Sequence, residues 1–292
     1  MTDDRAVPLP PDQSWIADKG VTRRQALAGS VVAAGYALAA QPLSATAITT
    51  PDQGLDAGMV RFAAGDIEMG AYRAKPKGRR NLPVIIVVQE IFGLHEWIRD
   101  IVRRFAQAGY YAIAPDLYQR QGDATKVADF KTLYSEIVSK VSDAQVMADL
   151  DALVRFVPGD GGNAKRLGIT GFCWGGRITW LYAAHNPRLR AGVACYGRVK
   201  GTGTELQPHN AIDEVARINA PVLGLYGARD KGIPVADVEA MNDALKAANK
   251  PSAIHLYAEA DHGFLADYRP SYNEAAARDA WSRTLAHFKK YL

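Results

Sequence analysis

The sequence of 292 residues predicts an α/β fold, with a mostly parallel central sheet and helices on both of its faces. Short apolar runs alternate with amphipathic stretches from residue 84 to the C-terminus, as they do when parallel strands are joined by crossover helices. Most of these runs are apolar along their whole length, which is typical of strands buried on both faces. No internal repeat or linker interrupts the pattern, so we expect one domain over residues 59–292.

Each element is predicted from the period of its apolar residues and from the turn residues that bound it. An antiparallel pair, Met59 to Ala63 and Ile67 to Arg73, is expected at the edge of the sheet, before the parallel core. The parallel strands are then predicted at Val84 to Val88, Tyr111 to Ala114, Leu167 to Thr170, Ala191 to Cys195, Val222 to Tyr226 and Ala253 to Tyr257. The helices are predicted at Trp97 to Ala108, Asp143 to Phe156, Arg177 to Ala184, Pro234 to Ala248 and Glu274 to Tyr291.

Two stretches, Tyr118 to Ala128 and Lys200 to Asp213, follow strand ends and show neither helix nor strand periodicity. Ligands of open α/β sheets bind beyond the carboxyl ends of the strands, so both stretches are candidates for the rim of a pocket. For the second stretch, an ordinary surface loop is an equally good interpretation.

The N-terminus has the pattern of a twin-arginine export signal. Thr22-Arg23-Arg24 is followed by the small and apolar residues Ala26 to Ala40, and Ala45-Thr46-Ala47 offers a cleavage site. A membrane anchor is less favoured, because the run Ala26 to Ala40 is shorter than the ~20 apolar residues that a spanning helix needs. We therefore expect residues 1–47 to be a signal peptide used by the Tat machinery and cleaved after Ala47. Residues 48–58 would then form a short N-terminal segment of a periplasmic protein.

Composition argues against several classes of partner. The formal net charge is +4, and the basic residues are scattered apart from the cluster at Lys75 to Arg80, which is most simply a solvated turn. Nucleic acid is therefore not expected as a partner. After the signal, no apolar run is long enough to span a membrane. Neither an organic cofactor motif nor His, Asp and Cys residues at metal-ligand spacing are found, and the glycines at 159–162 lack the rest of a phosphate loop.

The motif Gly171-Phe172-Cys173-Trp174-Gly175-Gly176 carries the most information about function. It places a cysteine where the G-x-S-x-G nucleophile elbow carries serine, between a predicted strand and a predicted helix. Gly171 and Gly175 leave room for a strained turn, and Gly176 lets the helix pack closely on the sheet. The motif therefore predicts covalent catalysis on an α/β-hydrolase fold.

Asp230 and His262 complete a possible triad. Each follows one of the last two predicted strands, which gives the hydrolase chain order of nucleophile, acid and histidine. Either residue alone could be an ordinary turn residue, but their matching positions favour the triad. A helix N-terminus and a histidine both help to form a cysteine thiolate. Asp230 would orient the imidazole ring.

Two further groups are expected near the nucleophile. In this fold the oxyanion is stabilised by the backbone N–H after the nucleophile and by one after the first parallel strand, here those of Trp174 and Ile91. Glu90 brings a carboxylate to the same place, which is unfavourable beside a thiolate unless one of the two holds a proton. Glu90 therefore either regulates Cys173 or is held in a local turn, and spacing alone leaves both interpretations open.

The chain contains two cysteines, Cys173 and Cys195. A disulfide between them would inactivate the nucleophile, but a domain of this size does not need one bridge for stability. We expect Cys195, at the end of a predicted strand, to be a buried free thiol.

These motifs together resemble the dienelactone hydrolase (carboxymethylenebutenolidase) family. The resemblance extends from about Met59 to Leu292 and is carried by five segments: Gln89-Glu90-Ile91-Phe92-Gly93, Ala114-Pro115-Asp116-Leu117-Tyr118, the Cys173 elbow, the Asp230 turn and Asp261-His262-Gly263-Phe264. It implies a Cys173, His262 and Asp230 triad that forms an acyl-enzyme from an enol lactone. It also implies that Glu90 partners the cysteine at rest and swings away when substrate binds.

The resemblance also suggests residues that contact the substrate. The arginine that binds the substrate carboxylate in that family falls on Arg120, and Phe264 is a further candidate contact. A second carboxylate-binding arginine is replaced here by Ala266, and Arg269 is the nearest substitute. This departure and the predicted export argue for a lactone or ester other than dienelactone. The alternatives are a non-catalytic protein that binds a small acid, and a thiol redox protein with Cys195 as the resolving partner.

Overall fold

The computed structural model describes residues 49–292, and the predicted signal peptide lies outside them. Its eight strands form one sheet in the order β1-β2-β4-β3-β5-β6-β7-β8. The strands are β1 (Leu55–Ala64), β2 (Ile67–Pro76), β3 (Leu82–Val88), β4 (Tyr111–Pro115), β5 (Gly162–Phe172), β6 (Ala191–Cys195), β7 (Val222–Gly227) and β8 (Ala253–Tyr257). The α-helices are α2 (Glu96–Gln107), α3 (Phe130–Glu136), α4 (Asp143–Asp160), α5 (Trp174–His185), α6 (Val235–Ala247) and α7 (Glu274–Tyr291). Short 3₁₀ turns lie at Ala124–Lys126, Val138–Lys140 and Ala211–Arg217.

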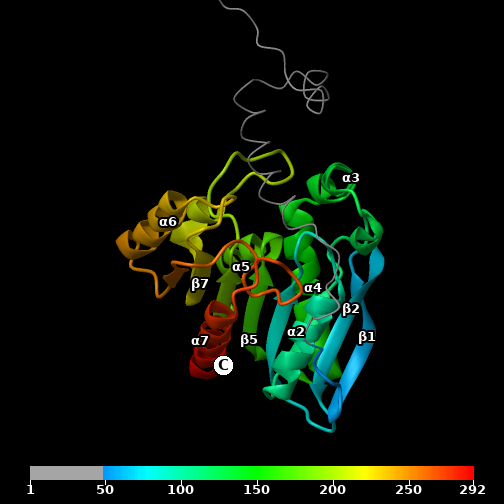
Figure 1. The fold of residues 1–292 in the computed structure, drawn as a ribbon. Helices are drawn as coiled ribbons and strands as arrows, with labels where there is room; N and C mark the ends of the chain where they lie inside the picture. Colours follow the sequence, from blue (N-terminus) through cyan, green and yellow to red (C-terminus); the bar gives the residue numbers. More distant parts are fainter. Residues whose placement is uncertain (1–48) are drawn as a thin grey trace, which may run out of the picture.

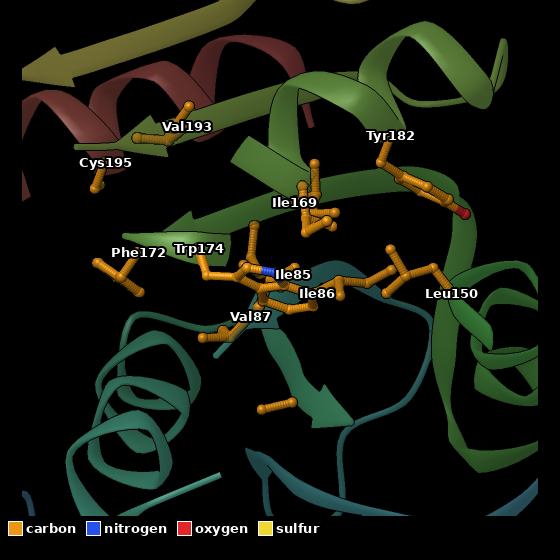
Figure 2. Close-up of a cluster of buried hydrophobic side chains, with 14 of the residues drawn as sticks. Ile85, Ile86, Val87, Leu150, Ile169, Phe172, Trp174, Tyr182, Val193 and Cys195 are labelled. Carbon is orange, nitrogen blue, oxygen red and sulfur yellow. The ribbon is translucent and has the colours of Figure 1, made fainter. Parts of the chain in front are cut away.

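The predicted fold class is confirmed. Strands β3 to β8 pair with one another in parallel, whereas β1 pairs antiparallel with β2 and β2 antiparallel with β4. Helices α2 and α7 cover one face of the sheet, and α4 and α5 cover the other (Figure 1). Phe105 of α2 packs 4.8 Å from Trp281 of α7 between ring centroids. Figure 2 shows the apolar side chains of β3, β5 and β6, including Ile85, Ile169 and Val193, in the buried layer between the helices.

Several boundaries differ from the sequence-based expectation. Strand β1 begins at Leu55, inside the segment expected to precede the domain, because it pairs with β2 along its whole length. The chain before it is also attached to α2, since Arg103 Nε donates to the Thr50 carbonyl at 2.8 Å. Helix α3 was not predicted, although Asp129 caps it by accepting a hydrogen bond from the backbone of Thr132 at 2.7 Å.

Within residues 49–292, each helix is either too short or too polar to span a bilayer.

Candidate active site

Cys173 lies at the sharp turn between β5 and α5, at the carboxyl edge of the sheet. Its backbone has φ 56° and ψ −115°, a conformation that costs a non-glycine residue about 1–3 kcal/mol. Its N–H donates to the carbonyl of Cys195 on the neighbouring strand at 3.0 Å, which holds the turn against the sheet. The residue is 1% exposed and caps the N-terminus of α5, where free backbone N–H groups favour an anion.

The glycines around Cys173 are required by close backbone contacts. A Cβ atom at Gly171 would lie 2.1 Å from the carbonyl oxygen of Gly175, and one at Gly176 would lie 2.4 Å from that of Cys195. No side chain fits at these distances. The strained turn and the close approach of α5 to the sheet therefore follow from the sequence of the elbow.

His262 and Asp230 are brought together by the loops after β8 and β7. Nδ1 of His262 lies 2.7 Å from Oδ2 of Asp230, and both residues are buried. The other carboxylate oxygen of Asp230 accepts hydrogen bonds from the backbone N–H groups of Gly232 at 2.8 Å and Ile233 at 3.1 Å. Asp230 is thus fixed by its own loop and can orient the imidazole ring.

The histidine also interacts with the candidate nucleophile. Burial lowers the pKa of His262, but the charge of Cys173, the hydrogen bond and charge of Asp230, and a hydrogen bond with Cys173 together raise it well above its ordinary value. The raised pKa favours a protonated His262 imidazole beside Cys173. Cys173, His262 and Asp230 form one connected cluster.

The backbone N–H groups of Ile91 and Trp174 are both candidate donors to an oxyanion. Trp174 is the first residue of α5 and Ile91 lies just after β3, so neither N–H has a partner within a helix or strand. In the described part of the chain, neither N–H donates to another group. Each is available to a ligand.

Glu90 is fully buried and is held by residues other than Cys173. Its Oε2 accepts hydrogen bonds from Tyr268 Oη at 2.7 Å, Arg269 Nη2 at 2.9 Å and His95 Nε2 at 3.1 Å. Burial raises the pKa of Glu90, but Arg269, His95 and Tyr268 outweigh it and lower the pKa to about 2. The structure therefore gives Glu90 an ion pair with Arg269 and no hydrogen bond to the sulfur.

Arg269 joins the site from the loop between His262 and α7. Its guanidinium lies 5.1 Å from the ring centroid of Phe92 and 5.0 Å from that of Tyr268. The ion pair with Glu90 raises its pKa although burial lowers it. Nη1 is buried and has no hydrogen-bond partner in residues 49–292, so it is the atom that can face a substrate.

Arg120 is not brought into this cluster. Its guanidinium donates to Asp149 at 2.6 Å, Asp66 at 3.1 Å and the carbonyl of Ala64 at 2.6 Å. These contacts attach the loop after β4 to α4 and to the β1–β2 turn. These contacts therefore indicate a structural role for Arg120.

Aromatic residues surround the triad. Phe264 is completely buried, with its ring centroid 5.6 Å from that of Tyr196 and 5.0 Å from that of Tyr257. Tyr196 follows β6 with φ 37°, and its ring lies 5.1 Å from His262. Its hydroxyl is buried without a hydrogen-bond partner among the described residues. Phe264 thus supports the wall of the site through Tyr196, which the sequence analysis did not single out.

Cys195 is a free, buried thiol, as is Cys173 in the structure. Burial raises the pKa of Cys195. Cys195 and Phe172 contribute to a cavity of about 260 Å³ between the sheet, α2 and α7. Its lining residues do not include Cys173, Asp230 or His262, so this cavity is separate from the triad.

Comparisons with known proteins show the family to which this chain belongs. The model of the dienelactone hydrolase family matches residues 69–292. A protein of Methylorubrum extorquens named "Putative carboxymethylenebutenolidase" is 52% identical over 281 residues, which is 96% of each chain. One of the same name from Escherichia coli K12 is 53% identical over 258 residues, 88% of this chain and 95% of that one. The crystal structure of a "Putative Dienelactone Hydrolase" from Klebsiella pneumoniae has a TM-score of 0.80 and 55% identity, covering 81% of this chain and 99% of that one.

Proposed function

This chain is a hydrolase of the dienelactone hydrolase family, and we propose that it cleaves a small lactone or carboxylic ester through an acyl-enzyme on Cys173. The observation that supports the proposal best is the cluster of three residues: Cys173 at a strained turn, His262, whose pKa is raised in part by Cys173, and Asp230, whose Oδ2 lies 2.7 Å from Nδ1 of His262. Such a cluster suits acyl transfer.

In the first step the thiolate of Cys173 attacks the acyl carbon, and a C–S bond forms as the carbonyl electrons move to oxygen. The N–H groups of Ile91 and Trp174 would stabilise that oxyanion. Its collapse breaks the C–O bond, and the leaving oxygen takes the proton of the His262 imidazolium. In the second step His262 removes a proton from water, which attacks the thioester. The C–S bond then breaks and the acid is released. This step leaves the proton on His262 and regenerates the thiolate of Cys173.

A substrate that carries a carboxylate is supported by Arg269. Its Nη1 is a buried, charged donor with no protein partner in the described residues, and a carboxylate would satisfy it. Arg269 would then perform the task that the resemblance assigns to the position of Ala266. Arg120 is a weaker candidate, because three protein acceptors already bind its guanidinium.

A redox role is less favoured. A resolving thiol must be deprotonated to attack, whereas burial raises the pKa of Cys195 and keeps its thiol protonated. A non-catalytic binding protein would not need a histidine and aspartate connected to the sulfur.

The proposal predicts a covalent intermediate. Incubation with a panel of enol lactones and aryl esters, with and without a carboxylate, should add the mass of one acyl group, observed by intact-mass spectrometry. Cys173→Ala should abolish the adduct, and Cys195→Ala, which removes the other buried thiol, should retain it. An adduct on Cys195, or turnover without any dependence on Cys173, would contradict the mechanism.

We also propose that the protein is exported to the periplasm, on the basis of Arg23-Arg24 and the apolar residues that follow. In the full-length chain, Arg23→Lys/Arg24→Lys should retain the protein in the cytoplasm, as measured by cell fractionation and immunoblotting. Arg5→Lys, outside the motif, should leave export intact. An unchanged distribution in the double variant would reject the twin-arginine route.

A further inference from the structure

The cavity of about 260 Å³ beside Cys195 lies apart from the triad and has no part in the proposed reaction. Its floor includes Phe172 and Cys195, which are paired across β5 and β6 at the carboxyl end of the sheet (Figure 2). Ile101 and Phe105 line it from α2, and Trp281 lines it from α7. Protein interiors are close-packed, and voids much larger than a water molecule are rare. A cavity of this size is therefore a candidate binding site.

Helix α7 leaves this space because it turns small residues toward the sheet. Ala277, Trp281 and Thr284 are spaced four and three residues apart, so they lie on one face of the helix. Ala277 and Thr284 are both buried. A larger side chain at position 277 would therefore occupy part of the cavity.

The hydroxyl groups on the inner wall already donate to the backbone. Oγ1 of Thr170 donates to the carbonyl of Val193 at 2.9 Å, and Oγ1 of Thr284 donates to that of Ala280 at 2.7 Å. Burial raises the pKa of Cys195, which keeps its thiol neutral. A ligand with several polar groups would leave them unpaired, which is costly in a buried site. The inner wall therefore favours an apolar ligand.

The charged side chains around the cavity are paired with one another. Nε of Arg104 lies 2.6 Å from Oδ2 of Asp100, and its Nη2 lies 2.6 Å from Oδ2 of Asp267. Nη2 of Arg278 lies 2.7 Å from Oε1 of Glu274. An ionised ligand would enter this cavity without a counter-ion, and burial of an unpaired charge is unfavourable. The ligand that fits is therefore uncharged.

We propose that this cavity is a second binding site, separate from the triad, for an uncharged aromatic molecule of one or two rings. Phe105, Phe172 and Trp281 offer such a ligand edge-to-face and offset-stacked contacts. An apolar cavity of about 150 Å³ is enough to bind benzene, so one of about 260 Å³ has room for a second ring. Because the site does not include Cys173, it is independent of the proposed reaction.

The test uses iodobenzene, an uncharged aromatic molecule whose iodine can be located by anomalous scattering. In soaked crystals of the wild-type protein, the iodine peak should lie in the cavity, among Phe105, Cys195 and Trp281. A soak with 4-iodobenzoate, which carries the same iodine on a charged molecule, should give no peak there.

Affinity in solution is measured by titration calorimetry with iodobenzene. Ala277→Leu should weaken binding by about tenfold or more, because the leucine side chain takes the ligand's space and its apolar contacts. Ala275→Leu makes the same change at an exposed position of α7 and should bind as wild type does.

An iodobenzene peak found only outside the cavity, or a 4-iodobenzoate peak inside it, would overturn the proposal. Equal affinities in Ala277→Leu and Ala275→Leu would also do so. If circular dichroism shows that Ala277→Leu does not fold, the wild-type crystals decide the question alone. Failure of the proposed hydrolysis would leave all of these results unchanged, because the lining of the cavity contains no member of the triad.

Discussion

Cys173→Ala is expected to lower kcat for every ester or lactone that the enzyme hydrolyses by at least ~10⁴-fold, because no other group can form the acyl-enzyme. Cys173, at the N-terminus of α5, is one of the groups that raise the pKa of His262, and the oxyanion donors act only on a carbonyl that the sulfur has attacked. Alanine retains the Cβ atom, so the strain of the turn at φ 56° is unchanged and the fold should be preserved. Steady-state hydrolysis of activated aryl esters measures the effect.

Cys195→Ala is the matched control, since it removes a buried thiol from the adjacent strand. Its kcat should remain close to that of wild type. A folded Cys173→Ala variant with wild-type turnover would show that another residue is the nucleophile, and the assignment of the triad would fall with it.

The sequence predicted the fold best where apolar runs end at turn residues. Strands β6 and β8 and helix α7 have the predicted bounds. Strand β5 begins five residues before the predicted start, at Gly162, because its first part is polar and partly exposed and gives no hydrophobic signal. Helix α4 continues through Pro158 to Asp160, although proline and glycine at that point indicated an earlier end.

For the site, the elbow and the order of Cys173, Asp230 and His262 were visible because each follows a strand end. The hydrogen-bond donors to Glu90 could not be predicted from the sequence. His95 and Tyr268 are far apart in the chain, and only the packing of their two segments brings them to one oxygen. Position alone also could not show that Arg120 is held by Asp149 of α4. Local chain geometry is readable from sequence, whereas the partner of a buried charge depends on tertiary packing.

Asp230→Asn is expected to lower kcat/KM by about 10³ to 10⁴-fold, because it changes the tautomer of His262. The asparagine oxygen can still accept from Gly232 and Ile233, as Oδ1 does now, so its amide nitrogen would face Nδ1 of His262. Two N–H donors cannot bond to each other, and the ring is driven to the tautomer with its proton on Nε2. That tautomer cannot take a proton from the thiol or from water.

The same substitution has a spectroscopic consequence. Asp230 is one of the groups that raise the pKa of His262, so its loss lowers that pKa, and the imidazolium loses its proton at a lower pH than in wild type. NMR titration of the ring measures this shift alongside the rates. Asp261→Asn is the matched control, because Asp261 accepts from the backbone N–H of His262 at 2.7 Å and does not orient the ring. If the two variants lose activity equally, the carboxylate of Asp230 supports only its loop; a much larger loss in Asp230→Asn assigns it to the imidazole.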